Sequence, residues 1–146
     1  MKQINKGIRF VKRPLNKPDS SVFEMQEETL LPIKQGQYLM RNIFLSMDPA
    51  LVGRMRDEDN YADKVNLGET MHAYGIGQVI QSKNDKVKVG EVRLGRIDMQ
   101  EYSYFNDDNA TTQINLGLAD ANWYLSAVGI TGATAYFALN EIGKPQ

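Results

Sequence analysis

Few residues in this sequence could perform chemistry by themselves, and their types exclude several kinds of site. There is no cysteine, which rules out disulfides and thiolate zinc ligands. His72 is the only histidine, and it cannot form a histidine-based zinc site alone, because zinc usually takes three or four ligands. No acidic loop has the residue spacing of a calcium-binding hand. Single histidines seldom act without partners, so we expect His72 to be an ordinary surface or loop residue.

The other candidates are one aspartate and a pair of tyrosines. Asp48 precedes Pro49, and because Asp-Pro favours a turn we expect it to shape one; the alternative is a direct role near a cleft. Tyr102 and Tyr104 are spaced by two in a strand-like stretch. Strand tyrosines commonly pack on neighbouring faces, so we expect these two to be packing residues rather than catalytic acids.

The composition is that of an ordinary globular protein and argues against two classes of partner. With 17 basic and 18 acidic residues the net charge is −1, which provides no basic face for nucleic acid. The sequence has no apolar run of about 18 residues, so no membrane partner is expected. The N-terminal segment is charged and lacks the apolar core of a signal peptide. The simplest expectation is one domain in a reduced, cytoplasmic setting.

The elements that must position these residues are predicted to be mainly strands. Up to Leu116 the sequence reads as short strands separated by turns, which is typical of a barrel or a sandwich. The expected strands lie within residues 7–14, 22–30, 37–48, 74–83, 85–95 and 99–116. The run 37–48 fits one strand only with a bulge, and Gly75 and Gly77 indicate a bulge or a close backbone approach. Arg93 is unusual in the middle of a strand, where an apolar residue would be expected. An exposed strand face would account for it.

Two further segments are predicted to lie outside the strands. Residues 54–70 are polar and show no periodicity, which indicates a mobile surface loop with at most one helical turn. A helix is predicted over 133–142, with Thr131 as its N-cap, Gly143 at its left-handed C-terminus and Pro145 preventing continuation. Its apolar side chains, Ala133, Tyr136 and Phe137, are expected to pack against the core.

Five motifs occur in an order that resembles a known family. They are "LMRNIFLSMDPALVGRM", "LGETMHAYGIGQVIQS", "KVGEVRLG", "MQEY" and "GITGATAYFALNEIGKP". From about Arg9 onward the chain resembles the N-terminal part of the zinc-free medium-chain dehydrogenase/reductases. The most similar branch is the leukotriene B4 12-hydroxydehydrogenase/prostaglandin reductase group, which includes the NADPH-dependent alkenal double-bond reductases.

The resemblance implies a division of the chain and a missing partner domain. Residues 1–125 would form a mainly β, GroES-like barrel, and residues 126–146 a connecting helix that leads to a Rossmann domain. That domain would bind NADP(H) through a glycine-rich turn between a strand and a helix, and "GIGQV" follows the wrong element to be that turn. We therefore expect the Rossmann domain to be absent from this chain. The full-length protein would be a homodimer and the 146-residue piece a monomer.

The resemblance also implies a reaction and tentative site residues. Family members transfer hydride from the nicotinamide to the β-carbon of an enone or enal, and a proton then reaches the α-carbon; no metal is needed. By resemblance Met47, Asp48 and Ala50 would lie near the substrate and Thr134 near the cofactor, while no catalytic residue is assigned. The alternative for Thr134 is an ordinary helix threonine whose hydroxyl bonds within the first turn.

Departures from the family pattern leave other functions open. The family usually has a tyrosine after Asp48-Pro49, and Ala50 in its place would give a larger, less polar pocket wall. Asp98-Met99 replaces a Gly-Trp pair. These changes fit a different substrate preference, including a zinc-free quinone oxidoreductase, or a decayed, non-catalytic GroES-like binding module. The piece alone is expected to be inactive.

Overall fold

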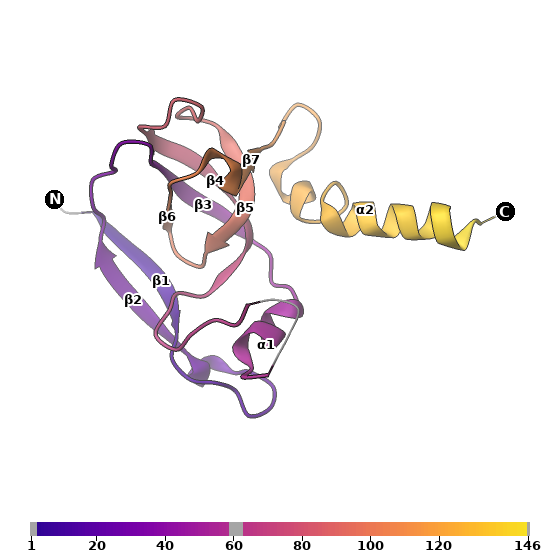
Figure 1. The fold of residues 1–146 in the computed structure, drawn as a ribbon, viewed down its shortest axis with the longest axis horizontal. Coiled ribbons are helices and arrows are strands. Elements are labelled where there is room, and N and C mark those ends of the chain that lie inside the picture. The colour runs from indigo at the N-terminus through magenta and orange to yellow at the C-terminus, as the bar shows by residue number, and fades with distance from the viewer. Residues whose placement is uncertain (1–2, 59–62, 146) are drawn as a thin grey trace.

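Two antiparallel sheets form the body of the molecule, and a C-terminal helix extends away from them (Figure 1). The computed structural model describes residues 3–58 and 63–145. In the smaller sheet β1 (Ile4–Phe10) pairs with β2 (Phe23–Thr29). The larger sheet has the strand order β6-β3-β4-β5-β7, with β3 (Tyr38–Leu45), β4 (His72–Ser82), β5 (Val92–Asp98), β6 (Tyr102–Phe105) and β7 (Thr111–Gln113). The prediction of a mainly β fold with a C-terminal helix is confirmed.

Backbone hydrogen bonds join the two sheets through β1. The Ile8 amide donates to the Met99 carbonyl (2.9 Å), and the Met71 amide donates to the Ile8 carbonyl (2.9 Å). Isolated bridges also connect Gly7 with Gln100 and Arg9 with Thr70. Strand β1 is therefore paired on both of its edges, which holds the small sheet against the segments that flank β4 and β5.

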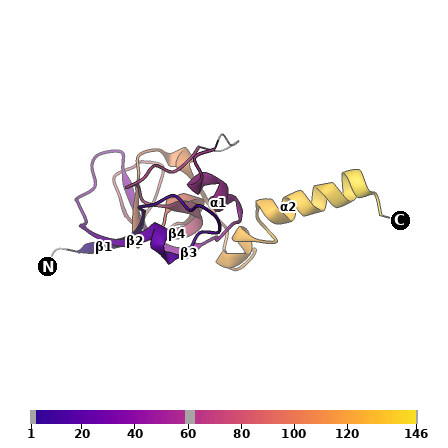
Figure 2. The same cartoon turned by 90° about the horizontal axis from the view of Figure 1, so that it is seen from below.

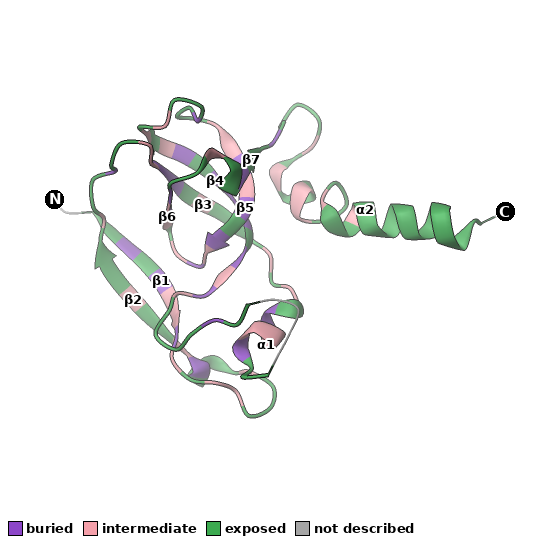
Figure 3. Ribbon diagram, viewed as in Figure 1, coloured by how far each residue is buried: buried purple, intermediate pink, exposed green. Residues whose placement is uncertain are grey.

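Two groups of buried residues make up the core, and buried positions are purple in Figure 3. One lies under β1 and under α1 (Ala50–Met55), and it consists of Phe10, Val22, Leu51, Met55, Val65, Met71, Ala73 and Met99. The other fills the larger sheet and consists of Tyr38, Met40, Val79, Val87, Ile97 and Phe105. Burying a side chain of this size stabilises the fold by about 1.5–3 kcal/mol. The first group fixes α1 beside the first residues of β4, which is the place where the pocket described below opens.

The irregularities predicted for β3 and β4 are present. The pairing of β3 with β4 shifts register between Leu39 and Met40 and again between Asn42 and Phe44. At Gly75 the backbone of β3 approaches so closely that a Cβ would lie 2.6 Å from the Phe44 carbonyl oxygen. Only glycine leaves room for that approach.

The polar segment before β4 is a surface loop, as predicted, but it is anchored at two points. Apart from Val65, which is fully buried in the first core group, residues 63–69 are exposed and form no helix or strand, and Thr70 bridges to Arg9. The helical turn is α1, which begins earlier than expected, at Ala50. Part of the predicted loop, residues 59–62, lies outside the described residues. One apolar side chain, Val65, determines the path of a segment that is otherwise polar.

A second difference concerns residues 85–95, which were expected to hold two strand pieces around a turn. Residues 83–91 contain no strand, and β5 begins at Val92. Gly90 in this turn has a φ of 94°, a left-handed conformation that glycine adopts without strain. An exposed strand face was the condition under which Arg93 would need no explanation, and this condition is not met, because only 7% of its surface is exposed. It donates hydrogen bonds to Glu91, Asp108 and Thr111 instead.

The C-terminal helix forms but does not pack as predicted (Figures 1 and 2). It comprises α2 (Ile130–Phe137) and a π-helical segment (Ala138–Gly143), capped by Gly129 instead of Thr131 and ended by Lys144 in the left-handed conformation. The expected core contacts are absent among the described residues, since Tyr136 is 64% and Phe137 59% exposed. The sequence pattern predicted the helix correctly. It does not show whether another part of the protein packs against the apolar side chains of that helix. No described helix is both long and apolar enough to cross a bilayer.

Candidate functional site

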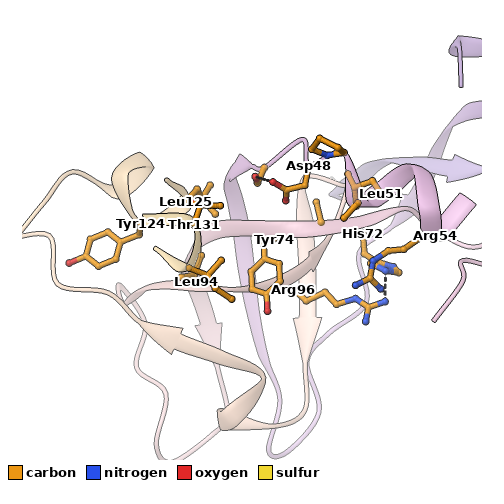
Figure 4. A pocket seen from close by; sticks show the side chains of 15 residues that line it. Asp48, Leu51, Arg54, His72, Tyr74, Leu94, Arg96, Tyr124, Leu125 and Thr131 are labelled. Atoms are coloured by element: carbon orange, nitrogen blue, oxygen red, sulfur yellow. Dashed lines mark hydrogen bonds between the residues drawn. The ribbon is translucent and has the colours of Figure 1, made fainter. Parts of the chain in front are cut away.

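A pocket of about 460 Å³ opens where five segments meet (Figure 4). The turn before α1, the first part of β4, the middle of β5 and the start of α2 all contribute to its lining. The short 3-10 helix at Ala121–Leu125 closes it on the side of α2. Its volume lies in the range of small-molecule sites. It is therefore the candidate functional site.

One wall of the pocket is apolar. It is formed by Leu94 of β5 and Leu125 of the 3-10 helix, which lie near Thr131 (Figure 4). Ala50, Leu51 and Ile130 are further apolar residues of the lining, and Leu51 lies beside Arg54 and His72. Tyr74 of β4 also lines the cavity. Such a wall favours a flat or aliphatic molecule, because contact with it removes apolar surface from water.

The opposite end of the pocket is cationic (Figure 4). Arg54 of α1, His72 of β4 and Arg96 of β5 gather there, and the Arg96 guanidinium donates a hydrogen bond to His72 Nε2. Burial, followed by the charges of Arg96 and Arg54, lowers the pKa of His72 to about 4. A guanidinium can only donate, so His72 Nε2 must carry a lone pair. Near neutral pH the group is thus two positive charges beside a neutral imidazole.

Three carboxyl groups lie near this end, and each has its own hydrogen-bond donor. Asp48 accepts from the Ser46 hydroxyl (2.9 Å). Glu69 accepts from the amide and side chain of Asn66, and these bonds lower its pKa. Asp98 accepts a long bond from the Gln100 side chain (3.4 Å), and burial raises its pKa, although the nearby Arg96 opposes that shift. Within residues 3–58 and 63–145, none of these carboxylates forms an ion pair with Arg54 or Arg96.

The structure brings only some of the predicted site residues to this pocket. Asp48 and Ala50 line it, whereas Met47 does not and is 75% exposed. Thr134 also lies outside the lining, and its hydroxyl donates to the Ile130 carbonyl (2.7 Å). This is the within-helix bond of the alternative interpretation. Roles in substrate or cofactor binding for these four residues stay predictions.

The cationic end was not predicted. His72 was expected on the surface or in a loop, and this is wrong: it is a half-buried strand residue facing the pocket. One signal was available, because His72 and Tyr74 alternate with the buried Ala73 and Gly75 and must share the other face of the strand. The register that pairs Tyr74 with Arg96 could not be read from that alternation.

The chemistry of the pocket differs from that of a metal site. Among the described residues no three histidine, cysteine, aspartate or glutamate side chains are grouped so as to hold a metal ion. The pocket offers apolar contact, two guanidiniums and a tyrosine hydroxyl. It can bind and orient a molecule, and the guanidinium and hydroxyl groups would donate hydrogen bonds to an electron-rich oxygen.

Comparison with known proteins identifies relatives over nearly the whole chain. Residues 6–114 match the model of a family described as the N-terminal domain of oxidoreductase. The chain is 32% identical over 147 residues to the NADPH-dependent curcumin reductase of Escherichia coli, covering 99% of this chain and 42% of that protein. It is 26% identical to a 2-alkenal reductase (NADP(+)-dependent) of Nicotiana tabacum, covering 88% of this chain and 39% of the relative.

A solved structure agrees with the sequence matches. CurA from Vibrio vulnificus in complex with NADPH superposes with a TM-score of 0.86 at 29% identity, covering 97% of this chain and 42% of that one. The chain thus spans about two fifths of the length of the relatives it matches. The order of the five sequence motifs, the mainly β fold and the family match agree, and the chain belongs to the N-terminal domains of the medium-chain dehydrogenase/reductase oxidoreductases.

Proposed function

We propose that this chain is the substrate-side part of an NADP(H)-dependent reductase of the carbon–carbon double bond in α,β-unsaturated aldehydes or ketones. On this proposal residues 1–125 bind the substrate, and residues 126–146 lead into a cofactor-binding domain. The observation that carries the proposal is the pocket, which joins an apolar wall to hydrogen-bond donors at the junction of the β body with α2. An enone has two parts that complement these: an aliphatic or conjugated chain for the apolar wall, and a carbonyl oxygen that accepts a hydrogen bond.

The residues at the α2 side of the pocket fit the nicotinamide end of the cofactor. Leu125 and Ile130 offer apolar surface for a flat ring, Thr131 lines the pocket, and Thr134 lies about one turn further along α2, outside the lining. The hydroxyls of Thr131 and Thr134 donate to the carbonyls of Ser126 and Ile130, so only their oxygen lone pairs remain available. They would hold a carboxamide by accepting from its N–H groups. When bound, NADP(H) supplies the hydride to the β-carbon of the substrate.

The pocket residues of this chain would bind and orient the substrate. Ala50, Leu51 and Leu94 would exclude water from the conjugated chain, which strengthens every polar contact inside the pocket. The Tyr74 hydroxyl, which has no partner among the described residues, would be a neutral donor for the carbonyl oxygen, where negative charge develops as hydride arrives. Ala50 leaves space that a tyrosine would fill.

The proposal is tested with the full-length protein that contains this chain. We expect NADPH oxidation on addition of an enal or enone, and a smaller rate with a quinone of similar size. Tyr74→Phe should lower kcat by about tenfold or more, as removal of one donor to a developing oxyanion does, while a Tyr104→Phe control on β6 should have little effect. Faster turnover of the quinone would contradict the substrate class. No turnover of any of them would indicate a binding module.

A further inference from the structure

The cationic end of the pocket contains charges that the proposed reaction does not require. An enone or enal is neutral, and a single donor suffices for its carbonyl oxygen. Yet Arg54, His72 and Arg96 come from three different elements, α1, β4 and β5, and converge on the same end of the cavity (Figure 4). Like charges repel, so holding two guanidiniums beside one pocket is unfavourable unless an anion is bound between them.

The donors of this cluster are only partly used within the protein. Arg54 donates one long bond to the Asp63 carbonyl (3.4 Å), and Arg96 donates to His72 Nε2. A guanidinium has five N–H donors, so most of those on Arg96 have no acceptor in the described part of the chain. The neutral His72 occupies one edge of Arg96 and orients it, which leaves the remaining N–H groups for a ligand.

The shape of the pocket assigns that ligand to the substrate. The apolar wall and the cationic end belong to one cavity of about 460 Å³, so a single molecule can contact both. Planar guanidiniums bind carboxylates through two parallel hydrogen bonds, and they do so more strongly than they bind a neutral oxygen. Resting on the proposed function, we propose that Arg96, with Arg54 and His72, forms an oxyanion-binding subsite for a carboxylate at the far end of the enone substrate. The subsite makes this chain selective for acidic over neutral enones.

His72 is the single histidine of the chain and therefore a built-in reporter of the subsite. In NMR titrations its ring C–H signals identify one residue without assignment of the whole spectrum. The probes are hexanoate, hexanol and inorganic phosphate, added separately to the 146-residue chain. We expect hexanoate to shift the His72 signals and to raise its pKa, because a bound anion offsets the two guanidinium charges. Hexanol has the same chain length but no charge, and its affinity should be lower than that of hexanoate by at least about fivefold.

Matched variants separate the subsite from general charge effects. Arg96→Gln should weaken hexanoate binding by about fivefold or more, in line with the loss of a charge-assisted hydrogen bond, and Arg54→Gln provides a second variant on a different element. Arg41→Gln, an exposed arginine of β3 outside the pocket, removes the same charge and should bind hexanoate like the parent chain. Equal effects of hexanol and hexanoate, or unchanged binding in both pocket variants, would overturn the proposal. Phosphate binding as tightly as hexanoate would indicate a site for free anions and would overturn it too.

A kinetic arm distinguishes failure of the subsite from failure of the proposed function. The full-length protein is assayed with NADPH on an enone that carries a terminal carboxylate and on its methyl ester. We expect a lower KM for the acid than for the ester, and a ratio of the two KM values that moves towards one in Arg96→Gln. If neither compound is reduced, the proposed function fails while the NMR titration still reports on the anion subsite. If both are reduced with equal KM, the subsite fails and the reductase stands.

Discussion

Two arginines of β5, three residues apart, have opposite surroundings. Arg93 is buried, and all three of its nitrogens are bonded: to the Glu91 carboxylate (2.6 Å), to the Thr111 hydroxyl (2.7 Å) and carbonyl (2.6 Å), and to the Asp108 carbonyl (3.0 Å). Arg96 is exposed at the pocket, and its described contact is with a neutral imidazole. The difference shows that the sign and type of a side chain do not reveal its role. What separates a structural cation from a binding cation is whether the protein supplies its acceptors.

The largest effect expected from this comparison is at Arg93. Arg93→Met should destabilise the chain by about 2–4 kcal/mol, because it leaves the half-buried Glu91 carboxylate without its charged partner and removes the donors to the carbonyls of Asp108 and Thr111, which connect β7 and the preceding turn to β5. Urea unfolding of the 146-residue chain measures the change in the free energy of unfolding. A loss below about 1 kcal/mol would mean that Arg93 contributes no more than Arg96 to the free energy of unfolding.

Replacing both members of the Arg93–Glu91 pair should reduce the free energy of unfolding by less than replacing Arg93 alone. In Arg93→Met combined with Glu91→Leu no uncompensated charge remains, so about 1–2 kcal/mol of the loss should be recovered relative to Arg93→Met alone. The same unfolding measurement, with Glu91→Leu as the remaining corner of the cycle, provides the interaction free energy. A double variant as unstable as the sum of both singles would show that the pair is not coupled.

His72 provides a pH-dependent test of the pocket side of the comparison. Its pKa of about 4 in the folded chain lies below its ordinary value of 6.5, so between these values the unfolded chain binds a proton that the folded chain does not. The free energy of unfolding should therefore decrease as the pH falls through this window. Because His72 is half exposed, solvent screening reduces the effect to about 1 kcal/mol.

The measurement compares the parent chain with His72→Asn at about pH 7 and about pH 5, since the carboxyl groups that also titrate are common to both. The parent should lose more stability than the variant. In Arg96→Gln the NMR titration midpoint of His72 should rise towards 6.5, as one of the two nearby positive charges is gone. A midpoint already near 6.5 in the parent would contradict a neutral His72 in the pocket.

The smallest effect is expected for Arg96 itself. Arg96→Met should change the free energy of unfolding by less than about 0.5 kcal/mol, because the residue is exposed and forms no ion pair with any described carboxylate. Thermal or urea unfolding beside Arg93→Met shows the contrast directly. A loss similar to that at Arg93 would remove the distinction between the two arginines.

The pocket was only partly predictable because its members are distant in the sequence. Asp48 and Ala50 were identified through a motif, and they line the cavity. His72 and Arg96 are 24 residues apart and meet because β4 and β5 pair in one register. A shift of that register by one residue would turn Arg96 away from the pocket and towards the core.

Local patterns in the sequence determined the strands, the bulge in β3, the need for glycine at Gly75 and the family to which the chain belongs. These features depend on neighbours along the chain: alternation, turn residues and backbone space. Tertiary structure alone decided that Val65 is buried, that Arg93 is enclosed while Arg96 is open, and that the apolar side of α2 has no packing partner among the described residues. Burial and charge pairing are properties of surfaces brought together from distant segments, and no single stretch of sequence contains both of the surfaces that meet.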